Sequence, residues 1–220
     1  MCGRFTFQPS EEFYERFQII NRLDGLVARY NIAPGQMVPV VIAQGPNHVM
    51  LMRWGLIPHW AKDAKSSYKM INARIETLAQ RPAFRSLLAA NRCLVPAGGF
   101  YEWRQEDKGK TPYYIHPKSH QFFAFAGLYD VWTTPDGEAL YTFTIITKEA
   151  DAFMSHLHNR MPVILERALE DAWLDQEITS TRAVLDILER SAGVALDAYP
   201  VSRMVNKPSV DNDLLIQPVE

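Results

Sequence analysis

The segment CLVPAGGFYEWR, residues 93–104, says more about the fold than any other part of the chain. Its aromatic and β-branched residues favour strands at 93–97 and 100–104. Further strands of similar composition are expected at 113–116, 122–126, 128–132 and 141–147, with Asp136-Gly137 as a hairpin turn. Strands grouped in this way, without alternating helices, indicate a largely antiparallel sheet.

The flanking segments add helical patterns and a few more strands. Ser10 can cap a helix with an apolar stripe of Phe13, Phe17 and Ile20, and Pro82 should begin a helix that runs to about residue 90. Further helices are expected at 148–157, 167–174 and 181–190, and further strands at 38–43, 49–54 and 199–202. No linker divides the chain, so we expect one domain, 1–220, with an α+β fold: a barrel-like sheet with peripheral helices.

Bulk composition limits the possible functions. The chain has 220 residues, 47% of them apolar and 22% charged, which excludes a disordered or fibrous protein. The net charge of −2 gives no sign of a nucleic-acid partner, so a DNA-binding surface would need basic residues gathered on one face. Cys2 and Cys93 form no CxxC pair, so we expect neither a metal site nor a cofactor.

The sequence contains no pattern that directs the chain to a membrane. The apolar run at 122–128 is too short to span a bilayer, and the first residues lack the apolar stretch of a signal peptide. We therefore expect a soluble cytoplasmic monomer with both thiols reduced.

The second residue is chemically the most informative. If Met1 is removed, Cys2 has a free amine and a thiol on adjacent carbons, with reference pKa values of about 7.7–8.0 and about 8.5. This pair suits aldehydes, because the amine forms an imine and the thiol then closes a thiazolidine ring. The ring-opened sugar of an abasic site in DNA is such an aldehyde. Ring closure also removes the imine that would otherwise promote β-elimination and strand breakage.

Two other interpretations of Cys2 stay open at this point. A cysteine in position 2 can stand there by chance, in a small strand that only packs. The N-terminal-nucleophile glutamine amidotransferases also begin Met-Cys-Gly, and they use the freed cysteine for acyl transfer to water or to a synthase partner.

Several blocks of sequence narrow the choice. They are MCGRF at 1–5, YNIAPG at 30–35, RWGLIPHWAK at 53–62, INARIET at 71–77, GFYEW at 99–103 and HNRMP at 158–162. In combination they closely resemble the SOS response-associated peptidase (SRAP) family, from Met1 to the Ile216-Gln217-Pro218 tail. The resemblance to amidotransferases ends after Gly3.

The family resemblance implies the SRAP fold, a function and a set of site residues. Members lose their first methionine, by their own peptidase activity or otherwise, and then cross-link to abasic sites in single-stranded DNA, which shields the strand from cleavage. Matched to the family pattern, Cys2 resembles the nucleophile, Asn72 the positioning residue, and Glu102 and His158 the acid–base pair. The family commonly has Asp after this His, whereas this chain has Asn159, which puts in doubt a contact that raises the imidazole pKa.

The site residues allow a functional and a structural interpretation. Asn72, Arg74 and Glu76 alternate, so in an extended segment they share one face, where the amide can hold the N-terminal amine or thiol. Glu102 lies between aromatic residues, where a desolvated carboxyl has a raised pKa and can deliver protons. The structural alternatives are a loop asparagine bonded to its own backbone and a solvated glutamate paired with Arg104.

The candidate DNA-binding residues combine positive charge with a flat ring. Arg4, Arg74, Arg85 and Arg160 are candidate phosphate ligands, and Trp60 is a candidate stacking platform. The structural alternative for any tryptophan is core packing, which we expect for Trp54.

The leading prediction is a covalent abasic-site sensor that associates with the nucleoid when bound to DNA. A non-covalent reader of single-stranded or modified DNA and an amidotransferase-type hydrolase remain as alternatives.

Overall fold

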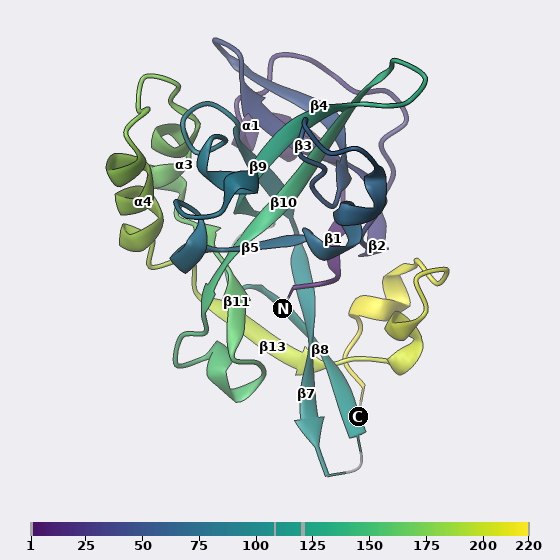
Figure 1. Ribbon diagram of the computed structural model, residues 1–220. Coiled ribbons are helices and arrows are strands. Elements are labelled where there is room, and N and C mark those ends of the chain that lie inside the picture. The colour runs from purple at the N-terminus through teal and green to yellow at the C-terminus, as the bar shows by residue number, and fades with distance from the viewer. Residues whose placement is uncertain (1, 108, 120–121, 220) are drawn as a thin grey trace.

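The structure, a computed structural model, describes residues 2–107, 109–119 and 122–219 (Figure 1). Its strands are β1 (Phe5–Phe7), β2 (Arg29–Ile32), β3 (Met37–Ala43), β4 (Asn47–Trp54), β5 (Asn72–Arg74), β6 (Arg92–Ala97), β7 (Gly99–Glu106), β8 (Gly109–Pro117), β9 (Phe123–Thr133), β10 (Ala139–Glu149), β11 (Arg160–Pro162), β12 (Ile164–Leu165) and β13 (Leu196–Pro200). The α-helices are α1 (Glu11–Arg16), α2 (Pro82–Arg85), α3 (Arg167–Leu174) and α4 (Thr181–Arg190). The 3₁₀ helices are η1 (Ala64–Lys69), η2 (Ile75–Thr77), η3 (Met154–His156), η4 (Arg203–Asn206) and η5 (Asp213–Ile216).

Two expectations, on the processing of Met1 and on membrane spans, can be compared with the described residues. Met1, on which the predicted processing acts, lies outside them. Within them, no helix is long and apolar enough to cross a membrane.

The centre of the molecule is a closed barrel of five strands. β10, β4, β3, β6 and β9 are hydrogen-bonded in that order, and β9 pairs back onto β10. These pairings are antiparallel except for β10 with β4, and the short β5 is a second parallel partner of β10. The predicted α+β fold with a largely antiparallel, barrel-like sheet is therefore confirmed.

A second sheet stands beside the barrel and includes the N-terminal strand. Its order is β13-β8-β7-β1-β2, and every pairing is antiparallel. The β7–β8 hairpin projects away from the barrel at the bottom of Figure 1. Phe5 of β1 lies opposite Phe100 of β7, so the first residues of the chain are fixed beside the segment that leaves the barrel.

The aromatic core joins the two sheets. The Phe5 ring packs edge-on against Trp54 and Phe125 of the barrel, with ring centroids 5.1 Å and 5.9 Å away. Trp54 is fully buried, as the sequence predicted. On the outside of the barrel, Trp173 of α3 donates its indole N–H to the Cys93 carbonyl at 2.9 Å (Figure 1).

The predicted helix at 148–157 is wrong. Lys148 and Glu149 instead end β10, where they lie opposite Met161 and Arg160 of β11. Only Met154–His156 forms a short helix, η3. Pairing with β11 thus overrides the local helical pattern, as tertiary contacts often do.

The ends of other strands and helices also differ from the prediction. The segments 122–126 and 128–132 form one strand, β9, which continues through Gly127. A Cβ at Gly127 would lie 2.8 Å from the Cys93 sulfur, so glycine allows β6 and β9 to approach closely here. The helix that begins at Pro82 ends at Arg85 instead of near residue 90, whereas α3 and α4 lie where they were predicted. α1 begins after Ser10 as predicted but ends at Arg16, so Ile20, which is 63% exposed, lies outside the helix and its apolar stripe.

Candidate active site and nucleic-acid groove

Cys2 is completely buried against the barrel wall. Its backbone carbonyl accepts a hydrogen bond from the Asn72 side-chain amide at 2.9 Å, and its thiol faces the Arg4 carbonyl at 3.9 Å. Asn72 is held by β5, where it lies opposite Ile145 of β10. Burial raises the pKa of the Cys2 thiol, and the nearby charge of Glu102 raises it further. The site therefore holds a protonated thiol in a fixed position.

Glu102 lies on β7 with only 2% of its surface exposed. β7 pairs directly with β1, which brings this carboxyl within electrostatic reach of Cys2. Burial raises the pKa of Glu102, in the direction that its aromatic neighbours predicted. The alternative of a solvated glutamate paired with Arg104 is wrong, because Arg104 binds Glu106 at 2.5 Å. A carboxyl that keeps its proton to higher pH can act as a general acid.

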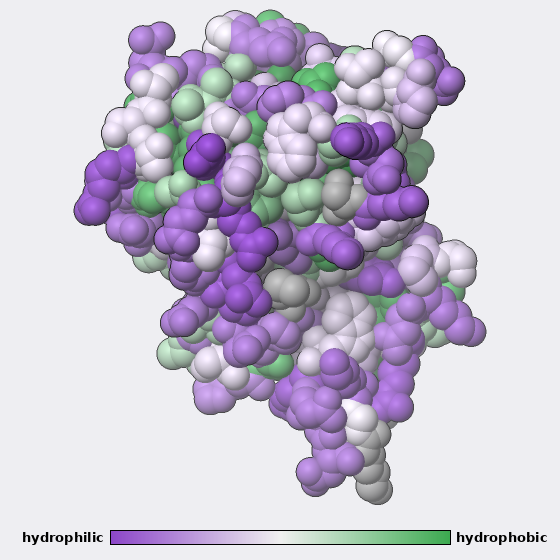
Figure 2. Space-filling view, viewed as in Figure 1, coloured by the Kyte–Doolittle hydropathy of each residue, from purple (hydrophilic) through white to green (hydrophobic). Residues whose placement is uncertain are grey.

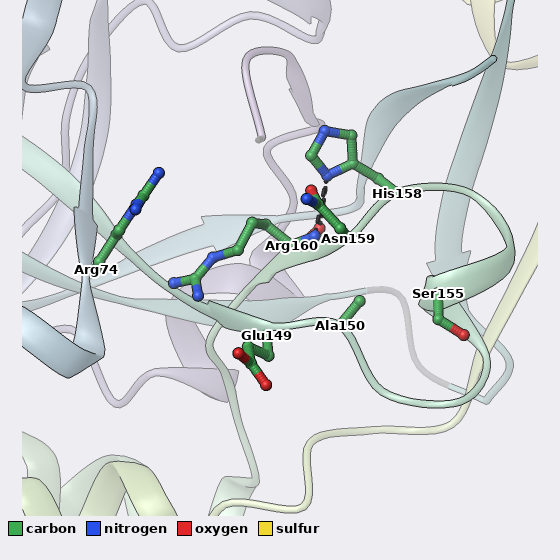
Figure 3. Close-up of a pocket in the computed structure, with 7 residues that line it drawn as sticks. All are labelled: Arg74, Glu149, Ala150, Ser155, His158, Asn159 and Arg160. Atoms are coloured by element: carbon green, nitrogen blue, oxygen red, sulfur yellow. Dashed lines mark hydrogen bonds between the residues drawn. The ribbon is translucent and has the colours of Figure 1, made fainter.

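His158 follows η3 and is half-buried. Its Nδ1 lies 3.0 Å from the Arg160 amide (Figure 3) and 3.2 Å from the Arg160 carbonyl, and these two contacts fix the orientation of the ring. Burial lowers the pKa of His158, so the site favours the neutral ring. The adjacent Asn159 is exposed, and its carbonyl accepts from the Ala150 amide at 3.1 Å.

A hollow of about 660 Å³ opens beside His158, and we call it the His158 hollow. It is lined by Arg74, Glu149, Ala150, Ser155, His158, Asn159 and Arg160 (Figure 3). Arg160 extends from β11 and forms a two-point ion pair with Glu76, at 2.6 and 3.0 Å. The sequence predicted that Asn72, Arg74 and Glu76 share one face of an extended segment. Only Asn72 and Arg74 do so, because Glu76 lies in η2.

A second hollow of about 530 Å³ lies on the other side of β5, and we call it the Trp60 hollow. It is lined by Trp60, Lys69, Met70, Asn72, Arg74, Thr77, Arg81, Pro82, Ala83 and Phe84. Trp60 is 60% exposed. Arg74 lines both hollows, and we call the two hollows together the groove. Figure 2 shows hydrophilic side chains over the middle of this face, where Figure 1 places β5 and β11. Sequence reasoning missed Lys69 and Arg81, because no local pattern separates them from other surface cations.

The other two predicted arginines are not among the residues that line the two hollows. Arg4 is half-buried next to Cys2, and it donates through Nη1 to the Gly3 carbonyl at 3.2 Å. Among the described residues, its buried Nε has no hydrogen-bond partner, and burial lowers the pKa of Arg4. Arg85 is exposed at the end of α2, just beyond the residues of that helix that line the Trp60 hollow.

Comparison with known proteins identifies the family of this chain. The family model described as "SOS response associated peptidase (SRAP)" matches residues 1–208. The chain is 45% identical over 222 residues to "Abasic site processing protein YoqW" of Bacillus subtilis (strain 168), and the match covers 99% of each chain. It is 34% identical over 225 residues to "Abasic site processing protein HMCES" of Gallus gallus, covering 87% of this chain and 66% of that one. A crystal structure of a protein from Bacteroides thetaiotaomicron superposes with a TM-score of 0.87 at 26% identity, covering 100% of both chains. This chain belongs to the SOS response associated peptidase (SRAP) family.

Proposed function

We propose that this protein processes abasic sites in single-stranded DNA and, once Met1 has been removed, bonds to them covalently through Cys2. The observation that supports this most is the placement of Cys2. Its carbonyl is hydrogen-bonded to Asn72 at 2.9 Å, and Asn72 in turn lines the cation-rich Trp60 hollow. Cys2 also lies within electrostatic reach of Glu102. The names of the YoqW and HMCES relatives support abasic sites as the substrate.

The proposed reaction has two stages at the aldehyde carbon of the ring-opened sugar. The free amine of Cys2 adds to this carbon, and the resulting carbinolamine loses water to leave an imine. The Cys2 sulfur then adds to the imine carbon while the thiol proton passes to nitrogen, which closes the thiazolidine. Glu102, whose pKa is raised by burial, protonates the departing hydroxide, and Asn72 holds the terminus in place.

The groove suits a single strand because it offers both charge and a flat surface. Arg74 and Lys69 can contact phosphates, and the exposed ring of Trp60 can stack on a base. Arg160 contributes less free charge, because its guanidinium already pairs with Glu76. The Met1 peptidase activity belongs to the same proposal, with Glu102 as the proton donor.

The test is whether a denaturation-resistant adduct forms with an abasic oligonucleotide, detected by denaturing gel and intact mass. The Cys2→Ala variant should form none. Cys93→Ala is the matched control, because Cys93 is equally buried but its amine stays in a peptide bond. A full yield of adduct from the Cys2→Ala protein would sink the proposal. Tight binding without any adduct from the wild type would favour a non-covalent reader, and glutaminase activity would favour an amidotransferase.

A further inference from the structure

The loop that presents Trp60, residues 56–61, is bonded at three points to side chains of two barrel strands. We propose that Asp130 and Trp132 of β9, together with Thr142 of β10, are positioning residues that fix this Trp60 loop and so set the affinity for single-stranded DNA. The inference rests on the proposed function, since it assumes that a nucleic-acid strand occupies the groove.

Asp130 anchors the residue before Trp60. One carboxylate oxygen accepts hydrogen bonds from both the backbone amide and the ring Nδ1 of His59, at 2.8 and 3.0 Å. The other oxygen accepts from the Val131 amide at 2.8 Å. Asp130 is only 6% exposed, whereas the side chain of His59 is 60% exposed. A buried carboxylate thus connects the barrel wall to an exposed loop.

Trp132 and Thr142 anchor the two ends of the same loop. The indole N–H of Trp132 donates to the carbonyl of Ala61, directly after Trp60, at 2.8 Å. The Thr142 hydroxyl accepts from the Ile57 amide at 2.9 Å. Thr142 lies opposite Asp130 in the β9–β10 ladder, so all three anchors belong to one rigid part of the barrel.

These anchors matter because the Trp60 ring has little support of its own. It is 60% exposed and lies in a loop without regular secondary structure. An unanchored loop would lose conformational freedom when the ring stacks on a base, and that loss would weaken binding. A loop that is already fixed avoids the loss, so the anchors act on affinity through Trp60.

The first experiment measures binding to a single-stranded oligonucleotide with a tetrahydrofuran abasic analogue, which has no aldehyde and cannot cross-link. Trp132→Phe replaces the indole by a smaller aromatic ring without an N–H and so removes one hydrogen bond to the loop; the Kd from fluorescence anisotropy should rise about 3- to 10-fold. Asp130→Asn should give a rise of similar size. Trp173→Phe is the matched control, because it also removes a buried indole-to-carbonyl bond, of 2.9 Å, but far along the chain in α3. Its Kd should stay at the wild-type value.

The second experiment repeats each substitution in a Trp60→Ala background. If Asp130 and Trp132 act through the Trp60 ring, their effect on Kd should vanish once the ring is gone, so the two changes are not additive. In the cross-linking reaction, Trp132→Phe should raise the half-saturating concentration of abasic DNA rather than lower the maximal rate. A general loss of folding would lower the active fraction and leave the half-saturating concentration unchanged.

Three results would each overturn the inference. They are an equal effect of Trp132→Phe with and without Trp60, an equal effect of the Trp173→Phe control, and no effect of Trp60→Ala on Kd. None of them bears on the proposed cross-link, which is tested separately by adduct formation in the wild type and in the Cys2→Ala variant. The two proposals can therefore fail separately.

Discussion

Glu102 offers the sharpest chemical test among single residues, since Glu102→Gln keeps the size of the side chain but removes its acidic proton. The single-turnover rate of adduct formation should fall about 10²- to 10⁴-fold if the carboxyl is a general acid. Met1 should also remain in place if the protein removes it unaided. Quenched time courses on denaturing gels and intact mass measure the two effects. A wild-type rate would show that Glu102 is only a structural residue of β7.

The same substitution, which should lower activity, should raise the stability of the folded protein at neutral and higher pH. The folded-state pKa of Glu102 is raised by burial, so above its unfolded value of about 4.3 the folded protein binds more protons than the unfolded chain. The free energy of unfolding therefore decreases as the pH rises through that window. The Glu102→Gln variant has no carboxyl to deprotonate and so keeps its stability. At about pH 8 its Tm should be higher than that of the wild type, by about 2–4 °C for each kcal/mol of unfolding free energy that the wild type has lost. At about pH 4 the two Tm values should be nearly equal. A Tm difference that does not depend on pH would contradict the assignment.

His158 should act mainly after the adduct has formed. Its ring is fixed by the Arg160 amide and favours the neutral form, which suits proton exchange as the thiazolidine reopens. His158→Ala should change the rate at which DNA is released, measured by a chase with excess competitor, more than the rate of formation. His156→Ala, an exposed neighbour in η3, is the control and should leave both rates unchanged.

The residues that sequence could identify are those whose chemistry depends on near neighbours. The amine and thiol of Cys2 are adjacent by covalent structure. The burial of Glu102 could not be settled in this way, because Tyr101 and Trp103 point to the other face of β7. The Arg160–Glu76 ion pair was not predictable, because it exists only where β10 brings β11 close to the segment after β5.

Among the secondary-structure elements, the connection between α3 and the barrel depends on Arg92. This side chain is fully buried, and its guanidinium donates to the carbonyls of Leu88, Ala89, Trp173 and Asp175. Arg92→Met would leave these carbonyls without a donor and should destabilise the protein by about 3–5 kcal/mol. Thermal unfolding should show a Tm lower by about 10 °C. Arg92→Lys should lose less stability than Arg92→Met, because an ammonium group can still donate to some of these carbonyls. It should not restore the wild-type stability, because it has fewer donors than a guanidinium. Equal stability of all three proteins would exclude this role.

A helix or strand could be predicted where the hydrophobic pattern of its own segment is enough to determine it. α3 and α4 bury one side of an amphipathic helix, and this period can be read from the segment alone. β5 has only three residues and is a strand because β10 pairs with it. The Trp60 loop has no repeating pattern, and side chains about 70 positions further along the chain determine its shape.

For the molecule as a whole, charge distribution matters more than net charge. The net charge is −2, yet Arg74, Lys69 and Arg81 line one groove. Binding to a single strand should therefore weaken with salt, with a log–log slope of about −0.7 for each phosphate contact. Arg74→Ala should reduce the slope by about that amount. Arg182→Ala should not change the slope, because Arg182 lies on the exposed side of α4 and pairs with Asp186. Affinity that does not depend on salt would rule out phosphate contacts.

The position of β1 between β2 and β7 has a mechanical consequence. If DNA is bonded to Cys2, tension on the strand enters the protein at the end of β1, which is hydrogen-bonded on both sides and anchored by the Phe5 ring against Trp54 and Phe125. A pull along β1 would load these bonds together rather than one after another. A motor that moves along the DNA would thus meet a protein whose attachment point is among its most resistant parts. To pass, it would have to detach the cross-link chemically or pull β1 from between β2 and β7.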